Sequence, residues 1–319
     1  MEKWMFIKKN LLLVFCCSTL VSIKSYTQII SDSISIDSSS QEEYYDASNA
    51  VVEYYVGDDI ENFRDIDTSL NNFQQFNPAR SGRFQQTYLT NIGAATIQKF
   101  FVLNRTVGFD HGRNQFDLYK FYVDSVKYYR ANTPYTNLFY VLGSKSEQIF
   151  AATHTQNFGP QINATIDFKK IASEGSYLHD RKENSNIALS SWYRTKNNIY
   201  RIQGAFVHNK INNDENAGVQ FDGNVFTQAS AFDFNVNRSS TATDWKNFEI
   251  QVQQTFDLAR KKEYAVNDST TGFYNEPYLQ LTHTFGYHDY DYMFEDLSTD
   301  TSYYPGKFVV MDTLRDVSD

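Results

Sequence analysis

The chain has 319 residues, with 29 Lys and Arg against 38 Asp and Glu, which gives a formal net charge of −9. This acidity argues against a nucleic-acid binder, which needs a basic face, and a mean hydropathy of −0.52 excludes a bundle of membrane-spanning helices. The chain nevertheless contains 23 Tyr and 26 Phe, whereas disordered chains are poor in aromatic residues. A polar chain this rich in aromatic residues needs a specific architecture.

The first 27 residues have the layout of a secretory signal peptide. Lys3, Lys8 and Lys9 precede an apolar run, Leu11–Ile23, and small residues follow it. The run is shorter than the about 20 apolar residues that a spanning helix needs. We therefore expect cleavage before Gln28 and export of the mature chain.

Both cysteines, Cys16 and Cys17, lie within this signal peptide. The chain from Gln28 onward has no cysteine, which excludes disulfides and thiolate chemistry there. Residues 28–83 form an acidic, Ser- and Asp-rich, largely irregular N-terminal segment. Residues 84–319 carry strand-like patterns, so we expect three parts: residues 1–27, 28–83 and 84–319.

Strand signals become clear from residue 148. Between Gln161 and Lys170, apolar residues alternate with strongly polar ones, which is the period of a β-strand with two unlike faces. The same pattern predicts strands at Gln148–Asn157, Asn186–Arg194, Ile199–Asn209, Asn247–Phe256 and Glu276–Tyr287.

The expected connections differ in length along the chain. The sequence predicts short turns after residues 157 and 194. It predicts longer links in the charged stretch Ser176–Ser185 and the polar stretch His208–Gly218. Short and long connections in turn are typical of an antiparallel up-and-down sheet with two unlike ends. The sequence therefore predicts an all-β, antiparallel architecture.

Two all-β architectures contain strands in which apolar and polar residues alternate in this way. A soluble sandwich turns its polar face to water, whereas a transmembrane barrel turns its apolar face to lipid and its polar face to the lumen. Gln161–Lys170 and Asn247–Phe256 each have ten residues, which matches the about 9–11 residues of a spanning strand. Aromatic residues mark the expected strand ends, as in the aromatic girdles of barrels, at Phe158, Phe168, Tyr193, Tyr200, Trp245, Phe256, Tyr278 and Tyr287.

The pattern thus favours an antiparallel up-and-down transmembrane β-barrel, preceded by a signal peptide and an acidic leader, in the outer membrane. Its polar strand faces would line the lumen. The predicted lumen-facing residues are Asn163, Thr165, Asp167, Lys169, Arg201, Gln203, Glu249, Gln251 and Gln253.

An ordered series of segments resembles the putative porins of the Bacteroidetes outer membrane. In chain order the segments are Asp67–Phe73, Asn77–Pro78, Asn91–Gly93, Gly108–Asp110, Phe116–Tyr119, Pro134–Tyr140, Gly143–Gln148, His154–Asn157, Ser173–Gly175 and Asn213–Gly218. The series covers about half of the chain. The resemblance implies a porin-like β-barrel.

The end of the chain departs from what this resemblance implies. Bacterial barrels usually close on a strand with a terminal aromatic residue, whereas this sequence ends Met311–Asp319, which is polar and acidic. The recognisable strands are also too few for an aqueous channel, which needs about sixteen. We therefore expect an N-terminal portion of a larger, here incomplete, barrel.

No residues have the spacing of a catalytic or metal site. His283 and His288 lie near acidic residues, but loop or strand-end polarity explains them better than a cation site. We expect no enzymatic activity, no metal site and no cofactor. The expected partners are outer-membrane lipid, small hydrophilic solutes and other outer-membrane proteins, but no nucleic acid.

Three functions follow from these patterns. The first is passive diffusion of small hydrophilic solutes or ions through the barrel. The second is a non-conducting outer-membrane barrel that serves as an interaction partner in a secretion or uptake complex. The third is a secreted β-sandwich binding module.

Overall fold

The computed structural model places all of its described residues in one compact unit, Ala47–Asp319. The expected signal peptide and the leader up to residue 50 lie outside the described residues. The described residues are 51–57, 59, 62–67, 69, 86–101, 112–220, 234–267, 270–298, 303 and 313–318.

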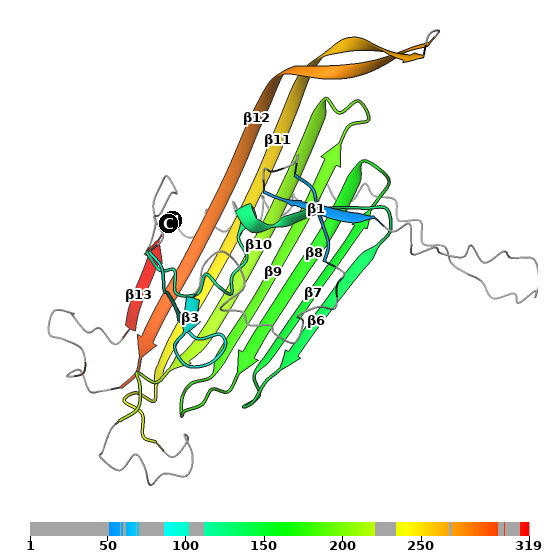
Figure 1. The fold of residues 1–319 in the computed structure, drawn as a ribbon. Coiled ribbons are helices and arrows are strands. Elements are labelled where there is room, and N and C mark those ends of the chain that lie inside the picture. The colour runs from blue at the N-terminus through cyan, green and yellow to red at the C-terminus, as the bar shows by residue number, and fades with distance from the viewer. Residues whose placement is uncertain are drawn as a thin grey trace, which may run out of the picture. The chain divides into compact units, whose positions relative to one another are not determined.

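An eight-stranded antiparallel sheet dominates the fold, and each of its strands pairs with the next one along the chain (Figure 1). This confirms the predicted all-β, antiparallel, up-and-down architecture. Within the described residues β6 and β13 are the two edges and do not pair with each other, so the barrel is not closed. The strands are β6 Tyr135–Leu142, β7 Gln148–Asn157, β8 Ile162–Ser173, β9 Lys182–Arg194, β10 Tyr200–Glu215, β11 Thr241–Asn267, β12 Thr270–Asp296 and β13 Thr313–Ser318.

The two ends of the sheet have unlike connections. Residues 158–161 and 195–199 link strands at one end, which we call the short-connection end. At the opposite end the links 143–147, 174–181 and 216–240 lengthen along the chain. This is the asymmetry that the sequence predicts for an up-and-down sheet.

The sheet is inverted relative to that of a water-soluble protein. On one face Asn184 and Asn209 are 0 % exposed, while on the other Ile166 and Leu189 are each 41 % exposed. A soluble sheet buries its apolar face because removing apolar area from water is favourable. Burial of the polar face and exposure of the apolar one is the arrangement of a barrel wall.

The polar face is covered by the described residues between 51 and 132, which we call the covering segment. It contains a three-stranded sheet in the order β2-β1-β5 and a two-stranded sheet, β3-β4. Figure 1 shows β1 lying across the strands of the large sheet. Its elements are β1 Val52–Val56, β2 Arg64–Asp65, β3 Gln86–Tyr88, β4 Thr96–Gln98, the 3₁₀ turn η4 Val123–Ser125 and β5 Lys127–Ala131.

Two predicted links were wrong in part. Residues 208–215 were predicted to begin a polar link, but they continue strand β10 to Glu215. Residues 182–185 were predicted to end a charged link, but they begin strand β9 at Lys182. Both regions keep the period of two, but both of their faces are polar. Asn209 and Asn213 are buried beneath the covering segment, whereas Lys210 is exposed, so hydropathy alone does not show the alternation.

Candidate functional site

All nine residues predicted to face a lumen lie on the covered face of the sheet. Asn163 and Gln203 lie on either side of Trp192 in the strand register, and Gln203 lies opposite Gln253. Whether this face borders a water-filled lumen stays a prediction. The strand period of two places the other six on the same face, namely Thr165, Asp167, Lys169, Arg201, Glu249 and Gln251.

Gln203 joins the sheet to the covering segment. Its Oε1 accepts a hydrogen bond from the Tyr55 hydroxyl at 3.0 Å, and its Nε2 donates to the Gly57 carbonyl at 3.1 Å. The same Nε2 also donates to Gln253 Oε1. One predicted lumen residue therefore holds strand β1 in place instead of facing open space.

Other predicted lumen residues make similar contacts. Glu249 is 1 % exposed, and its Oε2 accepts a hydrogen bond from the Val123 backbone amide at 3.2 Å. Lys169 Nζ lies 4.7 Å from the centre of the Phe121 ring. The covering segment thus satisfies polar groups of the wall that would otherwise need water.

Four buried asparagines of β9 and β10 contact the covering segment through its backbone, and we call them the asparagine ladder. Asn209 Oδ1 accepts from the Phe121 amide at 2.8 Å, and its Nδ2 donates to the Phe121 carbonyl at 2.9 Å. Asn186 Nδ2 donates to the Tyr119 carbonyl at 2.9 Å. Asn184 and Asn213 both donate to the Gly93 carbonyl, at 3.5 and 3.0 Å.

The asparagine ladder was not predicted from the sequence. Asn184 and Asn186 are two residues apart in β9, whereas Asn209 and Asn213 are four residues apart in β10 with Ile211 between them. Pairs of asparagines an even number of residues apart, which share one face of a strand, were the available signal. This signal indicates a strand whose inner face binds peptide groups, because an amide side chain both donates and accepts hydrogen bonds as a peptide does.

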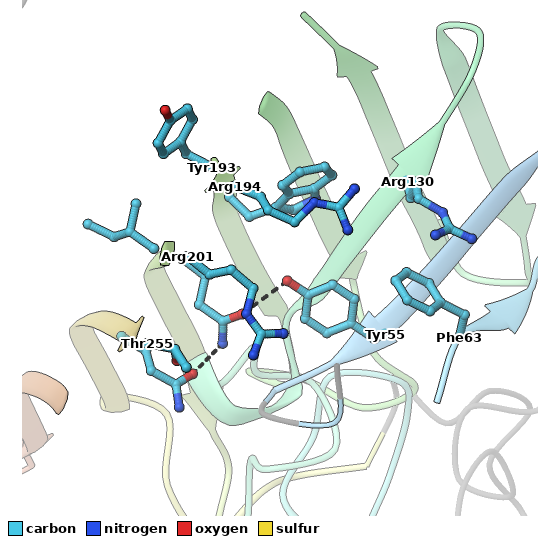
Figure 2. A pocket seen from close by; sticks show the side chains of 11 residues that line it. Tyr55, Phe63, Arg130, Tyr193, Arg194, Arg201 and Thr255 are labelled. Atoms are coloured by element: carbon cyan, nitrogen blue, oxygen red, sulfur yellow. Dashed lines mark hydrogen bonds between the residues drawn. The ribbon is translucent and has the colours of Figure 1, made fainter. Parts of the chain in front are cut away.

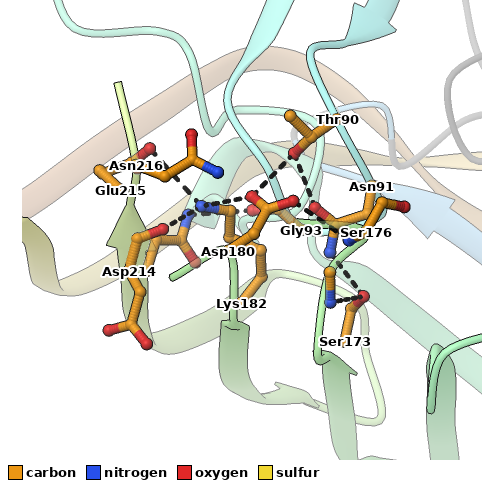
Figure 3. A network of polar contacts seen from close by, with 12 residues as sticks. Thr90, Asn91, Gly93, Ser173, Ser176, Asp180, Lys182, Asp214, Glu215 and Asn216 are labelled. Atoms are coloured by element: carbon orange, nitrogen blue, oxygen red, sulfur yellow. Dashed lines mark hydrogen bonds and ion pairs between the residues drawn. The ribbon is translucent and has the colours of Figure 1, made fainter. Parts of the chain in front are cut away.

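A buried ionic network holds the covering segment at the end of the sheet opposite the short-connection end (Figure 3). The side chains of Lys182 and Asp180 are each 2 % exposed and pair at 3.4 Å. Lys182 Nζ also donates to the Asp214 carbonyl and lies 3.5 Å from Glu215 Oε2. Asp180 Oδ1 in turn accepts from the Thr90 hydroxyl at 3.2 Å, so the network includes the covering segment.

Trp245 belongs to this face and not to an aromatic girdle, so its prediction as a girdle residue was wrong. It is 1 % exposed and packs edge-on against Phe116 of the covering segment at 6.3 Å. Lys120 Nζ lies 4.1 Å from its ring centre. Burial lowers the pKa of Lys120, while Asp117 at 3.0 Å acts in the opposite direction. Phe158, Tyr193, Phe256 and Tyr287 are exposed.

A cavity of about 210 Å³ lies between the covering segment and the short-connection end of the sheet (Figure 2). Tyr55, Phe63 and Arg130 line it from the covering segment, and Arg194 and Arg201 are among its lining residues from the sheet. Burial raises the pKa of Tyr55, while Arg201 and Arg194 act in the opposite direction. Three arginines therefore line this cavity, Arg130, Arg194 and Arg201.

None of the described helical turns is long and apolar enough to cross a membrane. The described residues contain no group of three or more His, Cys, Asp or Glu side chains placed to hold a metal ion. His283 and His288 project from opposite faces of β12, since they are an odd number of residues apart, so they do not form a shared site.

The chain matches the model of a family described as "Putative porin" over residues 53–319. No curated protein and no solved structure matches it. The matched range contains the whole eight-stranded sheet and almost all of the described covering segment, with the inverted wall and its buried polar face. The chain belongs to the "Putative porin" family, which indicates a transport-type, porin-like protein and, in general, a place in the outer membrane.

Proposed function

We propose that the protein is an outer-membrane channel for the passive diffusion of small hydrophilic solutes or ions. The polar face of the sheet borders the lumen, and the covering segment narrows it. The single observation that carries the proposal is the inverted burial of the wall, with Asn184 and Asn209 fully buried and Ile166 and Leu189 exposed. A secreted sandwich would have the opposite arrangement.

The connections also suggest how the wall is oriented. Bacterial barrels have short periplasmic turns and longer extracellular loops. The short-connection end, with residues 158–161 and 195–199, would then face the periplasm. Strand β6 begins at that end, because Tyr135 pairs with Thr155 near the 158–161 turn, so the covering segment would enter the wall from the periplasmic side.

One observation favours a second function, a non-conducting barrel that acts as an interaction partner. The covering segment is tied to the wall through the asparagine ladder, Gln203 and the Lys182 network. If these contacts are permanent, the covering segment acts as a plug. The protein would then transmit binding instead of solute.

Conductance in planar lipid bilayers separates the two functions. The full chain, reconstituted from detergent, should give stepwise single-channel currents, and vesicles that contain it should swell in small sugars but not in large ones. A protein that inserts, as shown by heat-modifiable gel migration, yet gives no current would contradict the channel and support the plugged barrel.

A further inference from the structure

The cavity at the short-connection end has an unusual arrangement of charge. Arg194 and Arg201 are directly opposite each other in the β9–β10 register and lie on the same covered face. Like charges directly opposite across two strands destabilise a sheet. A pair of arginines in this position therefore has an energetic cost that an anion between them would remove.

The nearby carboxylates offset only part of this positive charge. Arg201 pairs with Asp257 at 3.1 Å, and Arg130 pairs with Glu53. Arg194 has no carboxylate partner among the described residues, and its guanidinium lies 5.8 Å from the Trp192 ring centre. With three arginines and two carboxylates, the described side chains around the cavity carry a net charge of +1.

Arg201 also retains an unused donor. Its Nε is buried and has no hydrogen-bond partner in the structure. Leaving a buried donor without a partner is unfavourable, and a guanidinium presents its donors in a fork that matches a carboxylate. Arg201 and Arg194 both line the cavity drawn in Figure 2.

Aromatic rings also line the cavity. Phe63 and Tyr55 meet edge to face at 5.6 Å, and Trp192 lies among the lining residues. Such rings bury the flat surface of a cyclic solute. The volume of about 210 Å³ is below the about 300 Å³ where typical ligand pockets begin, which limits the occupant to one ring.

We propose that this cavity binds a monocyclic organic carboxylate, with the carboxylate between Arg194 and Arg201 and the ring against Tyr55, Phe63 and Trp192. The class includes uronic acids and simple aromatic acids. The inference gives the proposed channel a preferred solute. Only that consequence rests on the proposed function, because binding itself does not require conduction.

Isothermal titration calorimetry on the full chain in detergent tests the proposal. D-galacturonate and benzoate are the ring carboxylates, D-galactose supplies a ring without the charge, and acetate supplies the charge without a ring. At least one ring carboxylate should bind about tenfold or more tightly than both galactose and acetate, as expected for charge-assisted hydrogen bonds combined with ring burial.

Two variants separate the cavity from general electrostatics. Arg194→Gln should weaken binding of the ring carboxylate about tenfold or more, because it removes the unpaired guanidinium. Lys196→Gln removes the same charge two residues away, on an exposed turn position outside the cavity, and should change binding less than about threefold.

The proposal is overturned if neither ring carboxylate binds more tightly than galactose and acetate, or if Arg194→Gln binds like the wild type. Should Arg194→Gln fail to fold, the four-solute comparison on the wild type decides alone. If the protein binds a ring carboxylate but gives no current, the binding site is supported and the channel function is contradicted. If it conducts but binds no ring carboxylate, the channel function is supported and the binding site is contradicted.

Discussion

The contact between Asn209 and Phe121 offers the sharpest test of how the covering segment is held. Asn209 is 0 % exposed and makes two hydrogen bonds to one residue, accepting from the Phe121 amide at 2.8 Å and donating to its carbonyl at 2.9 Å. Replacing Asn209 with Ala removes both bonds. It also leaves a peptide amide and a carbonyl without partners in the interface.

The magnitude follows from these two bonds. A typical intramolecular hydrogen bond contributes about 0.5–1.5 kcal/mol net, and a buried group left unpaired costs about 1–3 kcal/mol. Asn209→Ala should therefore weaken docking of the covering segment by about 2–4 kcal/mol. At about 1.4 kcal/mol per factor of ten, the undocked population rises about 30- to 700-fold.

Limited trypsin digestion measures that population. Lys120 belongs to the covering segment and is 6 % exposed, packed against Trp245 of the sheet, so cleavage after it requires undocking. The cleavage rate tracks the open population when closing is fast. Asn212→Ala is the matched control, with the same residue type on the same strand but on the exposed face. Equal cleavage rates after Lys120 in the two variants would refute the reasoning.

Three further predictions concern the buried Lys182 network, the 174–181 link and the pH dependence of docking. Lys182→Met leaves the buried Asp180 carboxylate unpaired and should lower the unfolding free energy by about 3–5 kcal/mol in urea titrations. Lys210 is exposed, so Lys210→Met should change the unfolding free energy by less than about 0.5 kcal/mol. Equal urea midpoints for the two variants would contradict the buried network. Gly175→Ala should lower the temperature at which the protein unfolds and changes its gel migration more than Gly159→Ala does. Both glycines have φ near +80°, but only a Cβ at position 175 would lie 2.5 Å from atoms of Asp180. Burial raises the pKa of Tyr122 above its usual value of about 10. Its contribution to docking is thus complete below pH of about 10 and declines as pH rises toward the folded-state pKa. Tyr122→Phe should keep the protease protection of the covering segment to a higher pH than the wild type, and an unchanged pH midpoint would argue against this role.

The strands were predictable where apolar residues alternate with polar ones, as in Ile162–Phe168 of β8. The predicted strand Gln148–Asn157 has the bounds of β7, and Gln161–Lys170 differs from β8 by one residue at its start and three at its end. The period of two follows from an exposed apolar face and a covered polar face that alternate along the strands. The predicted lumen residues share a face for the same reason.

The covering segment was not predictable in the same way. It is held largely through its backbone, as at the Gly93 and Phe121 carbonyls, and such contacts leave no side-chain pattern in the segment itself. Trp245 was misassigned because an aromatic residue near a strand end fits a girdle as well as a buried contact. Its face follows from parity, since it shares the odd-numbered face of β11 with Glu249.

The central claim is that the apolar face of the sheet meets lipid and the polar face meets the covering segment. A chain from Gln28 has no cysteine, so single cysteines can be placed at successive positions of β9 from Ile187 to Tyr193 and labelled with a fluorophore in vesicles that carry a lipid-bound quencher. The account predicts strong quenching at 187, 189, 191 and 193 and weak quenching at 188, 190 and 192. Uniform quenching, or the opposite alternation, would contradict it.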